Sequence, residues 1–295
     1  MTATTRLLAL PDGRDLEVLD GGDPDGRVLV LHGGQPSAAV RSPLLDGAAR
    51  EAGLRLLTTS RPGYGASSPR PGAYRVRDDV DDVEALLDDV GAEEFVTLGW
   101  SGGGPRALAC AALLPDRCRA ATSLAGVAPH DAAGLDWSAG MAPENVAEFG
   151  AAEQGPEAYE SYLVAELLPV LRTGTDDLAA ALGGLVPPVD RQAMVDGMAP
   201  WMAETFSRAG AQGVRGMRDD GLAIVAPWGF DLARITVPTA VWQGTEDAMV
   251  PVAHGRWLAE HVPGTTAHLL DGEGHLSLVT RVGEMLAELK ELAGW

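Results

Sequence analysis

A serine flanked by glycines lies in the first half of the chain, in the stretch Gly99-Trp-Ser101-Gly-Gly103. An apolar run at 95–98 precedes it and a helical pattern follows it, so we expect Ser101 in a sharp turn between a strand and a helix. Glycine at 99 and 103 relieves the crowding in such a turn, and the helix N-terminus stabilises nearby negative charge. The chain holds 37 glycines, so the short pattern is not specific by itself. Its place between these two elements predicts a nucleophilic serine.

A nucleophilic serine needs a base, and the base needs a carboxylate that orients it. Asp247 follows the apolar run 239–242, and His275 follows the apolar run 267–270. The carboxyl ends of parallel strands meet at one edge of a sheet, so Ser101, Asp247 and His275 can converge there. Their order along the chain is serine, aspartate and histidine. This is the order in which a catalytic triad for acyl transfer occurs on a mainly parallel sheet flanked by helices.

Two other carboxylates compete with Asp247 for the histidine. Glu246 is the neighbour of Asp247, and Asp271 lies close to His275 along the chain. Adjacent residues in a turn point apart, so only one of Glu246 and Asp247 can hold the imidazole. Spacing alone leaves the choice open.

Strand-like and helical patterns alternate along most of the chain. The strand-like runs are 6–10, 16–19, 28–31, 54–58, 95–98, 120–124, 239–242 and 267–270. Helical patterns cover 76–90, the residues from Ser101 to about Pro115, 252–262 and about 278–292. Strands that alternate with helices predict an α/β fold with a mostly parallel central sheet flanked by helices, antiparallel only at its N-terminal hairpin.

The alternation stops between about 128 and 222, where helical segments punctuated by glycine and proline replace the strand-like runs. The alternating pattern resumes at Ile235. We therefore expect a core domain made of residues 1–127 and 222–295, with residues 128–221 forming a helical cap inserted into it.

Composition limits the classes of partner. The formal net charge is −20 at pH 7, which argues against nucleic acid and anionic membranes because their phosphates would be repelled. The N-terminal apolar run is too short for a signal peptide, and no apolar run approaches the roughly 18 residues of a membrane span. Cys110 and Cys118 are placed unfavourably for a disulfide framework. A cytoplasmic protein with a small-molecule substrate is expected; the oligomeric state is left open.

Five short motifs occur in an order that resembles the α/β-hydrolase fold family, in its capped, soluble bacterial form. The motifs are His32-Gly-Gly34, Arg61-Pro-Gly-Tyr-Gly-Ala-Ser67, the stretch around Ser101, Gly244-x-x-Asp247-x-x-Val-Pro251 and Gly274-His275. In this pattern the acid stands at Asp247, which favours Asp247 over Glu246 and Asp271. The family commonly has an aspartate where Ser60 stands, in a structural loop.

The resemblance also implies an oxyanion hole formed by the backbone N–H groups of Gly34 and Gly102. A glycine at 34 lets the backbone approach the substrate oxygen closely. Gln35 stands where proline iminopeptidases have proline, so that subfamily is disfavoured. A serine at 101 disfavours the chemistry of haloalkane dehalogenases and epoxide hydrolases, which on this fold use a carboxylate nucleophile.

Four aromatic or titratable residues are candidates for the substrate pocket. Trp100 is the variable residue of the turn around Ser101, and His130 opens the helical insertion. Trp137 and Trp201 belong to the apolar side chains of the insertion, most of which we expect to pack its own helices. Tryptophan fills irregular apolar pockets well.

These residues together predict a serine hydrolase that acts by acyl transfer on a small, largely apolar ester or lactone. No cofactor or metal is expected, since no His/Cys cluster has ligand spacing and the glycine-rich turn lacks the Lys-Ser/Thr of a phosphate loop. The same three residues also suit C–C bond hydrolysis, amide or aminopeptide cleavage, perhydrolysis or lyase chemistry. A ligand-binding, receptor-like protein with slow turnover is the alternative of another class.

Overall fold

Eight strands form a single sheet within residues 4–295, the part of the chain that the computed structural model describes. Their order across the sheet is β1-β2-β4-β3-β5-β6-β7-β8. The bounds are β1 Thr4–Ala9, β2 Asp15–Gly22, β3 Arg27–His32, β4 Leu54–Thr59, β5 Phe95–Trp100, β6 Cys118–Leu124, β7 Thr239–Gly244 and β8 Thr266–Leu270. The predicted strands are confirmed.

Only β2 runs against its neighbours in this sheet: it pairs antiparallel with β1 and with β4, and the other pairings in residues 4–295 are parallel. The predicted mostly parallel sheet is confirmed, and its antiparallel part extends one pairing beyond the N-terminal hairpin. The central strands β5 and β6 are buried on both faces, as expected for strands covered by helices.

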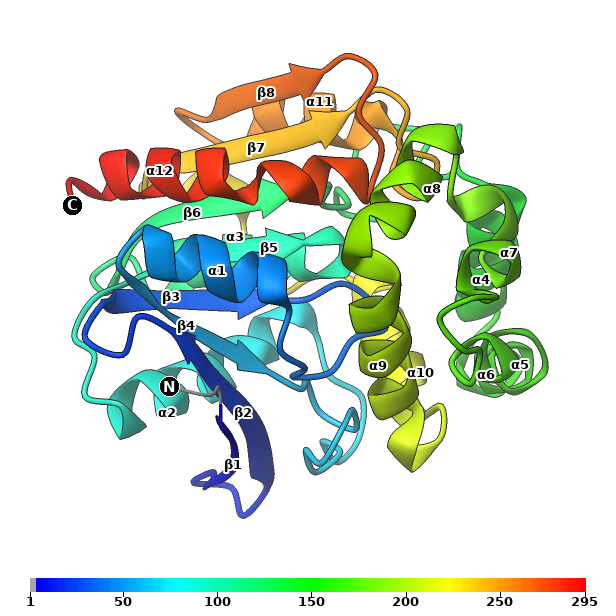
Figure 1. Cartoon of the computed structure of the whole chain (residues 1–295), viewed down its shortest axis with the longest axis horizontal. Coiled ribbons are helices and arrows are strands. Elements are labelled where there is room, and N and C mark those ends of the chain that lie inside the picture. The colour runs from blue at the N-terminus through cyan, green and yellow to red at the C-terminus, as the bar shows by residue number, and fades with distance from the viewer. Residues whose placement is uncertain (1–3) are drawn as a thin grey trace.

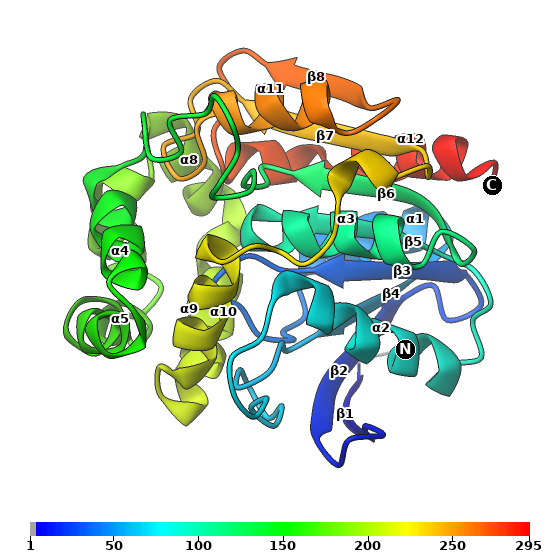
Figure 2. The ribbon, with the colours of Figure 1, turned by 180° about the vertical axis from the view of Figure 1, so that it is seen from behind.

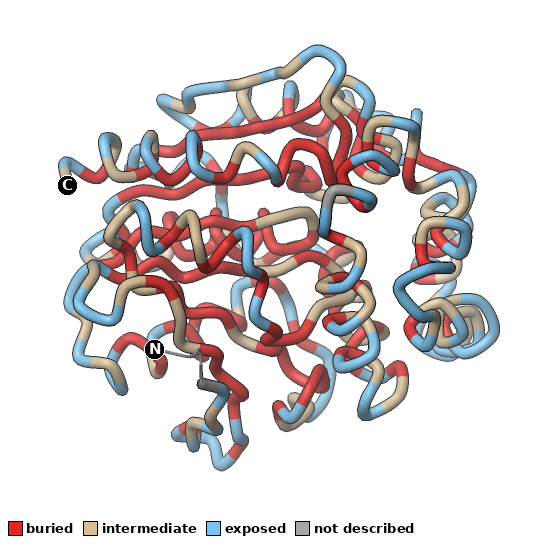
Figure 3. The backbone as a smooth tube through the Cα atoms, in the orientation of Figure 1, coloured by how far each residue is buried: buried red, intermediate tan, exposed pale blue. Residues whose placement is uncertain are grey.

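Helices cover the two faces of the sheet. On one face lie α1 (Pro43–Glu51) and α12 (Val282–Ala293), and on the other lie α2 (Asp79–Asp89), α3 (Gly104–Leu113) and α11 (Val252–His261) (Figures 1 and 2). Their apolar residues pack on the strands in two buried layers, and Figure 3 shows buried residues concentrated along the central strands. This arrangement brings the carboxyl ends of the parallel strands to one edge.

The chain between β6 and β7 is mainly helical. Its α-helices are α4 (Pro143–Glu153), α5 (Pro156–Tyr162), α6 (Leu168–Val170), α7 (Leu178–Ala181), α8 (Pro188–Ala193), α9 (Ala199–Ala209) and α10 (Arg215–Val225). Both views place them together at one end of the sheet, beyond the carboxyl ends of β3 and β5 (Figures 1 and 2). This helical segment therefore lies beside the edge of the sheet where Ser101 lies.

Cys110 and Cys118 are buried free thiols, which agrees with the prediction that they form no disulfide. Within residues 4–295, no helix combines the length and the apolar character needed to cross a membrane.

Candidate active site

Ser101 lies in a strained turn at the end of β5. Its φ angle is 57°, in the left-handed region that non-glycine residues rarely adopt. A Cβ at Gly99 would lie 2.2 Å from the Gly103 carbonyl oxygen, and a Cβ at Gly103 would lie 2.1 Å from the His32 carbonyl oxygen. Both positions therefore require glycine, because strand, turn and helix approach one another too closely for a side chain.

His275 and Asp247 form a buried pair on neighbouring loops, after β8 and β7. His275 Nδ1 lies 2.8 Å from Asp247 Oδ2. Asp247 Oδ1 accepts hydrogen bonds from the backbone N–H groups of Met249 and Val250, at 2.9 and 2.8 Å, which fix the carboxylate. Glu246 and Asp271 are exposed, and among the described residues the carboxylate hydrogen-bonded to the imidazole is that of Asp247. The structure thus pairs the histidine with Asp247, the acid that the sequence pattern favours.

The pKa of His275 reflects its surroundings. Burial lowers it, but the charge of Asp247, the hydrogen bond to Asp247 and the charge of Asp190 outweigh that effect and hold it above the ordinary value of 6.5. The arrangement therefore favours an imidazole that takes up a proton, as a general base must.

Asp190, on α8, holds the backbone of the histidine loop. Its carboxylate accepts hydrogen bonds from the N–H groups of His275 at 2.9 Å, Leu276 at 2.9 Å and Ser277 at 2.8 Å. The residue is fully buried, and a Cβ at Gly274 would lie 2.4 Å from its Oδ1. Sequence patterns did not identify Asp190, because an aspartate in a short helix resembles the many surface aspartates of this chain.

Ser101 and His275 line the same cavity, whose volume is about 240 Å³. Gly34, Gly102, Trp100 and Trp201 line it as well. Within the described residues, no hydrogen bond joins the Ser101 hydroxyl to His275; such contacts often form fully only when substrate binds. The cavity is thus the place where a substrate could meet both side chains.

Gly34 lies directly against the serine. A Cβ at Gly34 would lie 3.3 Å from Ser101 Cβ and 3.8 Å from Ser101 Oγ. Within residues 4–295, the Gly34 N–H donates to no protein acceptor, so it is free to bind a substrate oxygen. Gly102 follows Ser101 and lines the same cavity.

Two of the four predicted pocket residues face the cavity. The Trp100 ring stacks on Trp201, with centroids 5.9 Å apart, and lies 5.6 Å from the His275 ring. His130 instead lies 2.8 Å from a carboxylate oxygen of Glu153, outside the cavity lining. Trp137 is buried elsewhere, donating its indole N–H to the Ala128 carbonyl at 2.8 Å. The predictions for His130 and Trp137 are corrected, since His130 pairs with Glu153 and the Trp137 ring packs against Phe149 and against His254 on α11.

Glu148, on α4, is a cavity residue that the sequence analysis did not identify. Its Oε1 accepts a hydrogen bond from the Tyr159 hydroxyl at 2.7 Å. Burial raises the pKa of Glu148 to about 7, although the Tyr159 hydrogen bond opposes this shift. The wall of the cavity thus holds a carboxyl group that ionises near neutral pH.

Comparisons with known proteins agree with this architecture. A family model described as "alpha/beta hydrolase fold" matches residues 26–164. Epoxide hydrolase A of Mycobacterium tuberculosis is 29% identical and aligns over 99% of this chain and 98% of its own length. Pimeloyl-[acyl-carrier protein] methyl ester esterase of Chromobacterium violaceum is 25% identical, over 92% of this chain and 94% of its own. The crystal structure of a bromoperoxidase from Bacillus anthracis has a TM-score of 0.75 at 22% identity, covering 99% and 100% of the two chains. These matches and the observed sheet show that this chain has the alpha/beta hydrolase fold.

Proposed function

We propose that this protein is a serine hydrolase that cleaves a small, largely apolar ester or lactone by acyl transfer through Ser101. The observation that carries the proposal is the joint presence, around one cavity, of a strained, half-buried serine and a histidine paired with a buried aspartate. This is the arrangement in which a serine hydroxyl becomes a nucleophile.

In the proposed reaction, Ser101 Oγ attacks the carbonyl carbon while His275 Nε2 takes the hydroxyl proton. His275 then gives this proton to the leaving alcohol, and the acyl group stays on Ser101 as an ester. A water molecule, deprotonated by His275, attacks that ester and releases the acid and free serine. Asp247 keeps a proton on Nδ1, so that Nε2 is the nitrogen that accepts, and it stabilises the imidazolium that forms.

The N–H groups of Gly34 and Gly102 are the proposed donors to the oxyanion. Both residues line the cavity beside Ser101, and the Gly34 N–H has no acceptor within residues 4–295. Loss of one such donor typically lowers kcat about 10²–10³-fold.

The chemistry of a serine nucleophile favours an ester over an epoxide. Attack of a serine oxygen on an epoxide carbon would leave an ether on the enzyme, which water does not cleave under mild conditions. Attack on an ester carbonyl leaves an acyl-serine that water can cleave. The names of the two relatives include both kinds of activity, an epoxide hydrolase and a methyl ester esterase. Ser101 supports the second kind for this chain.

The cavity wall supports a mainly apolar substrate. The helical segment between β6 and β7 supplies Phe149, Leu182, Met202 and Phe206 to the wall. We propose that residues 128–221 act as the cap that closes the cavity and selects the substrate. Trp100 and Trp201 form an aromatic surface beside His275, where a flat or branched acyl group could rest.

The proposal is tested with a substrate panel of short-chain esters, lactones, vinylogous diketones and aminoacyl amides. We expect ester or lactone turnover with a burst of alcohol release when acylation is fast. Rapid cleavage of the diketones without ester turnover would replace the proposal by C–C bond hydrolysis. Ligand-induced stabilisation without turnover of any panel member would favour a binding protein. Ser101→Ala is the control for background hydrolysis.

A further inference from the structure

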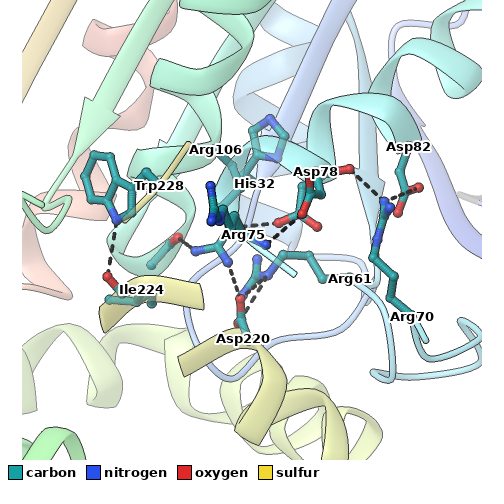
Figure 4. Close-up of polar contacts among 12 residues, drawn as sticks. His32, Arg61, Arg70, Arg75, Asp78, Asp82, Arg106, Asp220, Ile224 and Trp228 are labelled. Carbon is teal, nitrogen blue, oxygen red and sulfur yellow. Dashed lines mark hydrogen bonds and ion pairs between the residues drawn. The ribbon is translucent and has the colours of Figure 1, made fainter. Parts of the chain in front are cut away.

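Two arginines hold the peptide groups next to Ser101, and one aspartate connects the arginines. Arg61 donates from Nη1 to the Gly33 carbonyl and from Nη2 to the Gly34 carbonyl, each at 2.7 Å. Arg106 donates from Nη1 to the Gly102 carbonyl at 2.8 Å. Asp220 accepts from Arg61 Nη2 and from Arg106 Nη2, both at 2.6 Å (Figure 4).

The Gly33 carbonyl and the Gly34 N–H belong to one peptide group. A trans peptide is planar, so its carbonyl and its N–H point in opposite directions. When Arg61 fixes the Gly33 carbonyl, it also fixes the direction of the Gly34 N–H. A charged donor on the carbonyl polarises the peptide group, which makes that N–H a stronger donor.

The backbone at Gly102, on the other side of Ser101, is also fixed by hydrogen bonds. The Ser101 carbonyl, which shares its peptide group with the Gly102 N–H, accepts a hydrogen bond from Gly104 N. The Gly102 carbonyl is held by Arg106. Gly102 is thus fixed on both sides, once by the backbone of α3 and once by a buried arginine.

Asp220, which lies on α10, neutralises and orients both arginines. Asp220 and Arg106 are fully buried, and Arg61 is nearly so. The Tyr64 hydroxyl donates to Asp220 as a further hydrogen bond, at 3.0 Å. Burial raises the pKa of Asp220, but the charges of Arg61 and Arg106 overcome this and hold it below its usual value. The carboxylate therefore stays ionised between the two guanidinium groups.

The packing of α10 fixes where Asp220 can lie. A Cβ at Gly216 would lie 2.7 Å from the Gly63 carbonyl oxygen, so α10 touches the backbone of the loop that carries Arg61. Farther along α10, a Cβ at Gly102 would lie 3.3 Å from Ile224 Cδ1. This helix therefore contacts the loop that carries Arg61 and the turn that carries Gly102.

We infer that Asp220, Arg61 and Arg106 are positioning residues for the oxyanion hole. Asp220 on α10 aligns the Gly33–Gly34 peptide group through Arg61 and holds the Gly102 carbonyl in place through Arg106. The inference rests on the proposed function, and it assigns a role to the arginine of the Arg61-Pro-Gly-Tyr-Gly motif. Because Asp220 is carried by α10, the last α-helix before β7, it also links the helical segment between β6 and β7 to the chemistry.

The test compares Asp220→Asn with Asp82→Asn. Asp82 accepts hydrogen bonds from the buried Arg14 but does not contact the peptide groups beside Ser101, so its variant is a matched control for losing a buried ion pair. Both variants should lower Tm. Asp220→Asn should lower kcat for ester hydrolysis about 10–10²-fold with KM changed less than about threefold, a fraction of the effect of losing an oxyanion donor. Asp82→Asn should leave kcat within about twofold.

A second measurement reports on the oxyanion hole itself. The affinity for a trifluoromethyl ketone, whose serine adduct carries the oxyanion, should fall in Asp220→Asn by the same factor as kcat/KM. If kcat and the affinity for this ketone are unchanged in a folded Asp220→Asn protein, the inference is wrong. If that variant does not fold, Arg61→Lys takes its place, because lysine keeps the charge but lacks the fork that reaches Gly33, Gly34 and Asp220 together.

A third readout does not depend on turnover. In protein labelled with ¹⁵N-glycine, the Gly34 amide proton shift should move in Asp220→Asn and stay unchanged in Asp82→Asn. A wild-type protein that cleaves no ester would contradict the proposed function, and the amide shift would still decide the positioning role. An unmoved Gly34 signal would overturn that role even in an active enzyme.

Discussion

The carboxylate of Asp190 accepts a hydrogen bond from the backbone N–H of His275 at 2.9 Å, although 85 positions separate the two residues. One residue of the helical segment between β6 and β7 thus fixes the loop that carries the proposed base. Its charge also contributes to raising the pKa of His275, after the larger effects of Asp247.

Replacing Asp190 by asparagine should change the pH dependence of the reaction. A base must be neutral to act, and the pKa of His275 lies above 6.5, so wild-type kcat/KM should rise with pH and reach half its maximum above pH 6.5. In Asp190→Asn one negative charge near the imidazole is lost, so this midpoint should move to lower pH. Rates measured from pH 5 to 9 give the midpoint. Asp271→Asn, at an exposed position on the same loop, should leave it in place. A midpoint that moves upward in Asp190→Asn would contradict the electrostatic role.

The assignment of the acid is tested by Asp247→Asn against its neighbour Glu246→Gln. Without the Asp247 charge, His275 loses its preferred tautomer and the stabilisation of its imidazolium, so kcat should fall about 10³–10⁴-fold. Glu246 is exposed, and its variant should keep kcat within about twofold. Equal losses of kcat in the two folded variants would show that Asp247 is not the specific partner of the histidine.

The turn around Ser101 should not tolerate a side chain at position 99. A Cβ there would lie 2.2 Å from the Gly103 carbonyl oxygen, so Gly99→Ala must move the strand away from the turn. We expect a loss of about 3 kcal/mol or more in the free energy of unfolding, together with loss of hydrolysis. Urea denaturation measures the free energy of unfolding. Gly283→Ala on α12, where a Cβ meets no atom within 4 Å, should be neutral or slightly stabilising. A stable, active Gly99→Ala protein would refute the close approach.

Glu148 predicts a pH-dependent effect on stability. Its pKa is raised to about 7 from 4.5, so the folded state binds its proton more tightly than the unfolded state. The contribution of this carboxyl to stability is therefore lost as pH rises from about 4.5 through about 7. Glu148→Gln, which carries no charge, should be stabilised relative to the wild type by on the order of 2 kcal/mol more at pH 8.5 than at pH 5. Urea unfolding at the two pH values measures this difference. An equal change in the free energy of unfolding at both pH values would mean that the Glu148 carboxyl does not titrate between them.

The strands could be predicted from the sequence because parallel strands buried on both faces need runs of apolar residues, as in β5 and β6. Ser101, Asp247 and His275 were expected at one edge because each follows a parallel strand, β5, β7 and β8, although β8 is a largely exposed edge strand. Helix α1 is not among the helices predicted individually, although Ser42 caps its N-terminus and Pro43 begins it. A capping serine and a proline are a weaker signal for a helix than apolar residues that recur at helical spacing over many residues.

The residues that support the candidate site could not be predicted in the same way. The chain has 42 acidic residues, and nothing local distinguishes the buried Asp190 and Asp220 from exposed aspartates. Their roles come from contacts with residues far away in sequence. His130 and Trp137 failed as pocket predictions for a related reason, since the direction of a side chain depends on how the helices between β6 and β7 pack. The cytoplasmic location stays a prediction.

The central claim is that Ser101 is an activated nucleophile, and covalent labelling tests it most directly. Purified protein is treated with a fluorophosphonate, and the modified peptide is located by mass spectrometry, with Ser101→Ala as the control. The account predicts one phosphonyl group per chain, on Ser101, absent from the alanine variant and formed in parallel with loss of ester hydrolysis. A folded wild-type protein that hydrolyses esters while Ser101 stays unlabelled, or that is labelled at another residue, would contradict it.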